Sequence, residues 1–382
     1  MQTCEYARKS SIFQDNQLIY NEIRKGREAG DKIKVQGILV ATVCLLLCFA
    51  GCAVPGQTET TSSGESHSAE STASLDDADF QQESAGFAPK DQMTEPFTVS
   101  TPIQEVMDDP VFGRYGRLLF PVDDWYMSGN TLGELQLTWY NNIGPNETVE
   151  IVNTLWQRAN AGETVFYDIY TEEEKAEDPD KADTGLFFFK GDPGANFAVC
   201  NAGGGFAYVG AMQDSCPHAL EISKRGYNAF ALIYRPGAQT ACEDLARAIS
   251  FIFEHAEELE VDTEGYSLWG GSAGARMAAW LGSYGPAAFG GDDLPQPSAV
   301  IMQYTGHSDY TENDPPTFAC VGESDGIANW RTMERRLTAM STLGIPTEFH
   351  HYPGLPHGFG LGTSTVAEGW LDEAVAFWKA QM

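Results

Sequence analysis

A serine set among glycines lies where an apolar run passes into an amphipathic stretch. Residues 266–269 are apolar enough for a buried strand, and the residues after the glycines open a helix. Between them lies Gly270-x-Ser272-x-Gly274, in which the glycines let a strand and a helix pass closely. Such a turn would expose the Ser272 hydroxyl as a nucleophile, although a serine at this place could also simply cap the helix.

Two later loops contain a histidine and a carboxylate that could activate this serine. His357 lies in the glycine- and proline-rich stretch 354–360 rather than on the apolar face of an element, so it is the candidate general base. Asp325 lies in the loop 322–326, and its Gly-x-x-Asp spacing favours it as the carboxylate that orients the histidine. Glu323 is the rival carboxylate, and a turn-forming or capping role for Asp325 stays open.

Three consecutive glycines, at positions 203–205, directly follow another apolar run, 197–201. Glycines in such a turn can present backbone N–H groups to the negative charge that develops on a carbonyl oxygen under attack. One such donor typically contributes about 3 kcal/mol of transition-state stabilisation. A flexible turn without a role in chemistry is the alternative interpretation.

Apolar runs alternate with helical stretches from residue 164 onward, which predicts an α/β fold with a mostly parallel sheet. The expected strands are 164–170, 186–190, 197–201, 228–234, the run before Ser272, 299–304, 317–321 and 347–352. Helical periodicity is strongest at 151–156, ending near Gly162, at 245–253, and at Val366, Trp370, Ala374, Phe377 and Trp378. Open parallel sheets place their sites at the carboxyl ends of strands, where each of the loops described above begins.

The order of the three candidates along the chain is nucleophile, acid, base: Ser272, Asp325, His357. At this point residues from about 164 to 382 resemble an α/β-hydrolase. The triple-glycine loop resembles that of bacterial esterases of the hormone-sensitive-lipase and acetyl-xylan or feruloyl esterase types. The resemblance implies the α/β-hydrolase fold, with helices on both faces of the sheet, and a Ser-His-Asp triad that cleaves carboxylic esters.

The same resemblance implies that the backbone N–H groups of Gly204, Gly205 and Ala273 form the oxyanion hole. Ala202 departs from the pattern, since many relatives carry a histidine ahead of the glycines. The proposed donors are backbone groups, so this departure affects the choice of subfamily rather than the oxyanion hole.

The first 52 residues are expected to be a leader, with an apolar core of about 13 residues at 38–50, too short to span a bilayer comfortably. The sequence Phe49-Ala-Gly-Cys52 resembles a bacterial lipobox, which implies lipidation of Cys52, although leucine is usual where Phe49 stands. An uncleaved membrane anchor is the alternative. Residues 53–96, rich in Ser, Thr and acidic side chains, are expected to form a disordered linker.

Either form of leader would put the remaining chain at the extracellular face of a bacterial membrane, lipid-anchored or secreted. Residues 97–163 form an N-terminal extension of unresolved role, either a cap over a substrate cleft or simple packing, before a catalytic domain at 164–382. The chain carries 54 acidic and 23 basic side chains, and such a surface repels polyanions, so we expect no nucleic-acid partner. The expected partners are the membrane and a small-molecule or polysaccharide ester.

The remaining cysteines and histidines give weaker signals. Cys200 and Cys320 are expected to be buried free thiols, and a Cys216–Cys242 disulfide is conceivable but not readable from spacing. His350 and His351 are expected to point to opposite faces of one strand. No paired-ligand motif for a metal occurs, so we expect neither metal nor cofactor.

Two other functions compete with the esterase interpretation. Serine peptidases of the prolyl-peptidase type share the same turn and triad, but no propeller-like repeat precedes the domain in this sequence. A surface protein that only binds its ligand could use the same scaffold, because fold does not fix function. The complete set of three candidate residues favours an enzyme.

Overall fold

The computed structural model of the chain describes residues 96–141 and 144–382. The expected leader, with Cys52, and the expected linker up to residue 95 lie outside these described residues. Within them, no helix combines the length and the apolar character that a membrane span requires.

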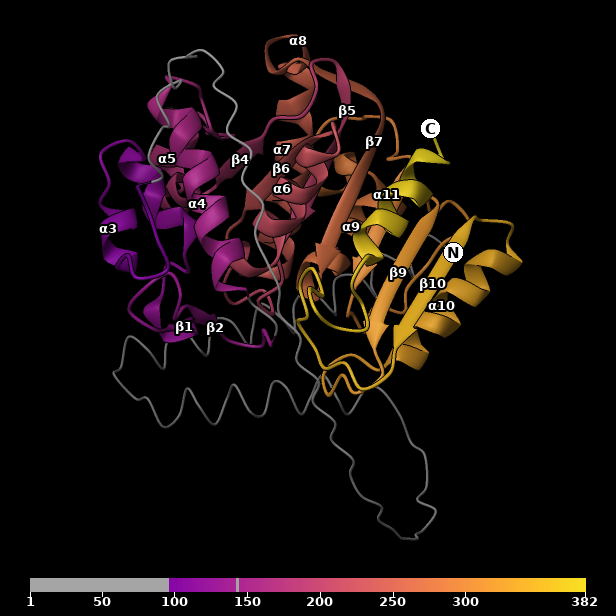
Figure 1. The fold of residues 1–382 in the computed structure, drawn as a ribbon. Coiled ribbons are helices and arrows are strands. Elements are labelled where there is room, and N and C mark those ends of the chain that lie inside the picture. The colour runs from indigo at the N-terminus through magenta and orange to yellow at the C-terminus, as the bar shows by residue number, and fades with distance from the viewer. Residues whose placement is uncertain (1–95, 142–143) are drawn as a thin grey trace, which may run out of the picture. The chain divides into compact units, whose positions relative to one another are not determined.

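A central sheet of eight strands organises the described chain, in the order β10-β9-β8-β7-β5-β6-β4-β3 (Figure 1). The strands are β3 (Phe166–Tyr167), β4 (Gly185–Phe189), β5 (Ala195–Asn201), β6 (Asn228–Ile233), β7 (Val261–Gly271), β8 (Ala299–Gln303), β9 (Thr317–Gly322) and β10 (Thr347–Tyr352). All pairs from β10 across to β6 are parallel, whereas β4 pairs antiparallel with β6 and β3 antiparallel with β4. The expected mostly parallel sheet is therefore confirmed.

Helices cover both faces of this sheet. They are α3 (Ile103–Met107), α4 (Pro145–Asn160), α5 (Glu172–Glu177), α6 (Ser215–Lys224), α7 (Ala238–Glu254), α8 (Ala256–Leu259), α9 (Ala273–Tyr284), α10 (Trp330–Thr342) and α11 (Trp370–Lys379). His351 of β10 stacks on Trp330 at the start of α10, and the adjacent His350 lies 3.5 Å from Glu373 of α11. Helices α10 and α11 therefore lie on opposite faces of the sheet, and so do the two histidines, as expected.

The carboxyl ends of the three central strands lie level with one another. In the register of the sheet, Gly270 of β7 is opposite Asn201 of β5 on one side and Met302 of β8 on the other. The loops that follow β5, β7 and β8 therefore leave the sheet at the same edge and at the same height. This edge is where the sequence places its candidate chemistry.

The glycines flanking Ser272 are needed at this edge for a steric reason. A Cβ atom on Gly270 would lie 2.2 Å from the carbonyl carbon of Gly274, and a Cβ on Gly274 would lie 2.0 Å from the carbonyl oxygen of Asn201. Contacts this short are forbidden, so only glycine lets α9 begin directly against β5 and β7. The close passage expected from the sequence pattern is confirmed.

The described residues of the extension, 97–141 and 144–163, pack into the same hydrophobic cluster as the sheet and its helices. Helix α4 begins with Pro145 at its first turn, ends at Asn160, close to the expected end near Gly162, and buries Ile151, Val152 and Leu155. A small antiparallel pair, β1 (Met127–Ser128) and β2 (Gln136–Leu137), precedes α4. Short 3₁₀ helices are η1 (Gly113–Leu119), η2 (Asp124–Tyr126), η3 (Pro179–Asp183), η4 (Ala211–Gln213) and η5 (Pro286–Phe289).

Two details of the expected elements were wrong. The strand expected at 164–170 is reduced to the two residues of β3, which pair only with the edge of β4. Val366 was expected on the apolar face of the last helix, but α11 begins at Trp370, after Gly369 in a left-handed conformation, and Val366 is 62% exposed. A single valine at the expected spacing does not extend a helix past such a glycine.

The four cysteines of the described residues are buried free thiols. This confirms the expectation for Cys200 and Cys320. It also answers the open question about Cys216 and Cys242, which are not joined to one another in this structure.

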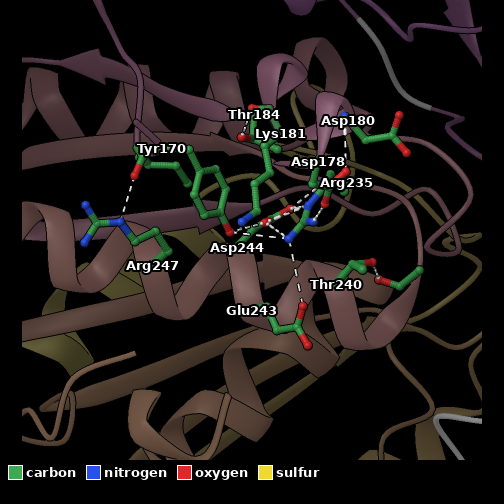
Figure 2. Close-up of polar contacts among 12 residues, drawn as sticks. Tyr170, Asp178, Asp180, Lys181, Thr184, Arg235, Thr240, Glu243, Asp244 and Arg247 are labelled. Carbon is green, nitrogen blue, oxygen red and sulfur yellow. Dashed lines mark hydrogen bonds and ion pairs between the residues drawn. The ribbon is translucent and has the colours of Figure 1, made fainter. Parts of the chain in front are cut away.

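A buried ion pair holds the loop that follows β6, and Figure 2 shows its surroundings. Arg235 donates from Nη2 to Asp244 Oδ1 over 2.7 Å, and its backbone N–H donates to Oδ2 over 2.7 Å. The Tyr170 hydroxyl adds a bond of 2.6 Å to Oδ1, and Asp178 lies against the outer side of the guanidinium. Burial raises the pKa of Asp244, so this carboxylate depends on its partners to stay ionised.

Replacing Arg235 with methionine should lower the free energy of unfolding by about 3–5 kcal/mol, because the Asp244 charge would stay buried without its cation. Denaturant unfolding followed by circular dichroism measures this change. Arg331→Met is the control, since Arg331 is exposed and stacks on Trp330, and it should change stability by less than about 1 kcal/mol. Equal effects of the two substitutions would contradict the importance of the buried pair.

Candidate active site

Ser272 lies at the turn between β7 and α9, in a backbone conformation that residues other than glycine rarely adopt. Its φ is 53° and its ψ is −111°, and its backbone N–H donates to the carbonyl of Gln303 over 2.9 Å. Although Ser272 is the residue before the helix, its hydroxyl makes no capping hydrogen bond. The capping interpretation therefore does not explain this serine.

The hydroxyl of Ser272 instead faces His357. Oγ lies 3.1 Å from His357 Nε2, and the other ring nitrogen, Nδ1, lies 2.7 Å from Asp325 Oδ2. Asp325 Oδ1 accepts the backbone N–H groups of Ile327 and Ala328 over 2.8 and 2.7 Å, which fixes the carboxylate. Hydroxyl, imidazole and carboxylate thus form one chain of hydrogen bonds, built from residues 85 and 32 positions apart.

The rival carboxylate has a different partner. Glu323 Oε1 lies 2.6 Å from Nδ1 of His351, on the strand rather than in the histidine loop. Its side chain is 35% exposed, whereas that of Asp325 is fully buried. Of the two acids that the sequence left in competition, only Asp325 contacts His357.

The triple-glycine loop lies against the serine. A Cβ on Gly203 would lie 2.9 Å from the Cβ of Ser272, so the loop could not lie this close to the serine with a side chain at position 203. Gly204 and Gly205 have φ angles of 127° and 64°, and a Cβ on Gly204 would lie 2.1 Å from the carbonyl oxygen of Tyr208. The loop therefore requires glycine for its conformation as well as for its contact with Ser272.

The hydrogen bonds of this loop separate its amides into two kinds. The N–H of Gly203 donates to Asp214 Oδ2 over 2.8 Å, so it is occupied. The N–H groups of Gly204, Gly205 and Ala273 donate to no group among the residues that the structure describes. These are the three amides that the family resemblance implied as oxyanion donors, and in this structure they remain free to bind a ligand oxygen.

Three buried residues behind the glycine loop were missed from the sequence. Asp214 is fully buried behind the glycine loop, and the hydroxyls of Tyr140 and Tyr304 donate to it over 2.8 and 3.2 Å. Burial first, and the Asp214 charge next, raise the pKa values of both tyrosines well above the usual range, so both keep their protons and donate. Asp214 directly precedes α6, and its sequence context alone suggests only a helix cap.

The ring of Tyr304 links this buried group to the histidine. It makes an edge-on contact with the imidazole of His357, with ring centroids 5.0 Å apart. The backbone on the far side of the histidine is held by Asn141, whose side-chain amide donates to the His357 carbonyl over 2.8 Å. Both contacts come from parts of the chain that the sequence did not connect with the site.

Comparison with known proteins gives one family match and several structural ones. The family model BD-FAE matches residues 192–296, a span that contains the glycine loop and Ser272 but ends before Asp325 and His357. No curated protein matches the chain.

Among solved structures, an acetyl ester-xyloside bifunctional hydrolase from Caldicellulosiruptor lactoaceticus is 19% identical; the match covers 56% of this chain and 95% of that one, with a TM-score of 0.48. A thermophilic esterase from the Planctomycetes species Thermogutta terrifontis is 22% identical, with coverages of 56% and 93% and a TM-score of 0.48. A sugar hydrolase from Lactococcus lactis is 20% identical, with coverages of 52% and 94% and a TM-score of 0.45.

The sequence identities and TM-scores of these matches are low. We therefore assign the fold from the order and direction of the strands and from the position of the serine turn. An eight-stranded, mostly parallel sheet carries Ser272 at the tip of its central strand β7, and the acid and the histidine follow β9 and β10. Residues 192–296 are similar to the BD-FAE family, and the chain has the α/β-hydrolase fold.

Proposed function

We propose that this chain is a serine hydrolase that cleaves carboxylic esters with Ser272 as nucleophile, His357 as general base and Asp325 as its orienting acid. The observation that supports the proposal most directly is the pair of hydrogen bonds, 3.1 Å and 2.7 Å, that joins the three side chains in that order. A serine hydroxyl is a weak nucleophile on its own, and a neighbouring imidazole is what makes it reactive.

In the first half of the reaction, His357 Nε2 takes the proton of the Ser272 hydroxyl as the oxygen attacks the ester carbonyl. The carbonyl oxygen becomes negatively charged and accepts hydrogen bonds from the free N–H groups of Gly204, Gly205 and Ala273. The imidazolium then gives its proton to the departing alcohol as the carbon–oxygen bond breaks. The products of this half are the free alcohol and an acyl group bound to Ser272.

In the second half, water takes the place of the alcohol. His357 removes a proton from the water, whose oxygen attacks the acyl carbonyl through the same tetrahedral arrangement, and Ser272 recovers its proton as the acid leaves. Asp325 holds Nδ1 protonated and stabilises the imidazolium in both halves without itself taking the proton. Because Asp325 is bonded to two backbone amides besides His357, it keeps its orientation throughout.

We propose further that the substrates are acyl esters on carbohydrate or on other extracellular molecules, and that the enzyme works at the outer face of a bacterial membrane. The lipobox-like sequence ending at Cys52 supports this location, and a surface enzyme suits a substrate too large to import. A peptidase of the prolyl-peptidase type and a surface protein that binds without catalysis are the alternatives.

Labelling of the full chain with a fluorophosphonate separates the enzyme proposals from the binding protein. We expect one adduct on Ser272, mapped by peptide mass spectrometry, and its absence would favour a binding protein. A panel of acetyl, feruloyl and longer acyl esters, assayed beside proline-containing peptide amides, then distinguishes an esterase from a peptidase. Turnover of the amides at rates equal to or above those of the esters would overturn the esterase proposal.

Ser272→Ala and His357→Ala should each lower kcat by about 10⁴-fold or more, because each removes a member of one cooperating unit. The double variant should be little slower than either single one, for the same reason. Initial rates on an activated acetyl ester measure the loss, and thermal unfolding checks that the variants are folded. Strictly multiplicative losses would indicate that the two residues do not act together.

Asp325→Asn should lower kcat by about 10⁴-fold, since an amide cannot hold the imidazole in the required tautomer or stabilise its charge. Glu323→Gln is the matched control: it changes a carboxylate of the same loop that contacts His351 instead, and it should leave kcat within about twofold. Full activity of Asp325→Asn together with an inactive Glu323→Gln would exchange the two assignments.

A further inference from the structure

The carboxylate of Asp214 is a buried acceptor for three donors, each from a different segment of the chain. The donors are the N–H of Gly203 and the hydroxyls of Tyr140 and Tyr304. Nδ1 of His218 also lies near the carboxylate, 3.4 Å from Oδ1. Burial lowers the pKa of His218, so this imidazole supplies no lasting positive charge. Among the described residues no lysine or arginine pairs with Asp214. The cost of burying this carboxylate must therefore be offset by the hydrogen bonds it accepts.

This carboxylate and the Tyr140 hydroxyl that donates to it pack directly against the serine turn and the glycine loop. A Cβ on Gly271 would lie 2.4 Å from Asp214 Oδ2, and a Cβ on Gly203 would lie 2.9 Å from the hydroxyl oxygen of Tyr140. Oδ2 itself is shared between Gly203 and Tyr140, each at 2.8 Å. A displacement of the carboxylate therefore moves Gly203, and with it the adjacent amides of Gly204 and Gly205.

The residue after Tyr140 holds the opposite side of the site. Asn141 donates from its backbone N–H to the carbonyl of Gly358 over 3.0 Å and from its side chain to the carbonyl of His357 over 2.8 Å. Gly358 has a φ of 68°, and a Cβ there would lie 2.3 Å from the carbonyl oxygen of Trp139. The loop that carries the histidine is therefore packed directly on residues 139–141.

We propose that Tyr140 and Asn141 are positioning residues that hold the two halves of the active site in register, Tyr140 through Asp214 and the glycine loop, and Asn141 through the backbone of His357. Their α-carbons are one peptide unit apart, about 3.8 Å. One short piece of chain therefore contacts both the glycine loop, through Asp214, and the loop that carries the imidazole. This gives the extension 97–163 a function that differs from both a cap and simple packing.

The kinetic part of this inference rests on the proposed hydrolase function, whereas its structural part does not. Tyr140→Phe keeps the ring and removes one donor from Asp214, and Asn141→Ala removes the bond to the His357 carbonyl. Tyr266→Phe and Asn196→Ala are matched controls. Tyr266 is another buried tyrosine, and it donates to the Pro295 carbonyl over 2.9 Å. Asn196 donates to the Glu264 carbonyl near the amino end of β5.

Hydrogen exchange of the full chain tests the structural part. We expect Tyr140→Phe to accelerate exchange at least tenfold in peptides covering 201–208, and Asn141→Ala to do the same in peptides covering 354–360. The controls should leave both regions unchanged. If neither variant alters exchange in its own loop, or if both accelerate exchange throughout the chain, the residues do not position these loops and the proposal is wrong.

Steady-state kinetics and inhibition by phenylboronic acid, which forms a tetrahedral adduct with a reactive serine, test the kinetic part. Each variant should lower kcat about tenfold with KM within twofold, and should weaken boronate inhibition by the same factor, because only the transition-state geometry is lost. Unchanged kcat despite faster exchange would overturn the positioning role. An inactive wild-type chain that no fluorophosphonate labels would refute the proposed function instead, while the exchange data would still decide whether residues 140 and 141 hold the loops.

Discussion

The contact between the start of helix α9 and the end of strand β5 is the constraint on which the site depends. Gly274 lies so close to the carbonyl of Asn201 that a single added carbon would overlap it. This contact forces the chain to turn sharply at Ser272, whose left-handed φ carries a cost of about 1–3 kcal/mol that the surrounding packing offsets. In return, the serine hydroxyl stands directly beside the glycine loop that leaves β5.

The glycine loop is held from several directions, which matters because oxyanion donors help only if they are already in place. Tyr234 donates to the carbonyl of Ala202 over 2.6 Å, and the N–H of Gly237 donates to the carbonyl of Phe206 over 2.8 Å. Gly237 follows Arg235, so the buried pair with Asp244 in Figure 2 supports the segment that meets the far end of the loop. Structure well outside the site thus limits how far its backbone donors can reorganise.

The order of the strands explains why segments far apart in the sequence meet at the active site. Level strand ends bring the glycine loop, the serine and the loop after β8 to one edge of the sheet, and β9 and β10 extend that edge to the acid and the histidine. The described part of the extension, 97–141 and 144–163, contributes no strand to this sheet but contacts both the glycine loop, through Asp214, and the histidine loop. The sheet therefore brings the reacting groups together, and the extension contacts the loops that carry them.

The amino-acid sequence predicted those features of the fold and the site that depend on a few consecutive residues. Short-range periodicity predicted the alternating strands and helices and the placement of Asp325 and His357 in loops. Steric limits on a few consecutive residues explained the glycines around Ser272. The choice between Asp325 and Glu323 required the folded structure, because both lie in one loop and differ in which distant histidine each contacts. The folded structure alone also joined Tyr140, Asp214 and Tyr304, because a buried carboxylate takes its donors from wherever the fold brings them, and no spacing in the chain records that meeting.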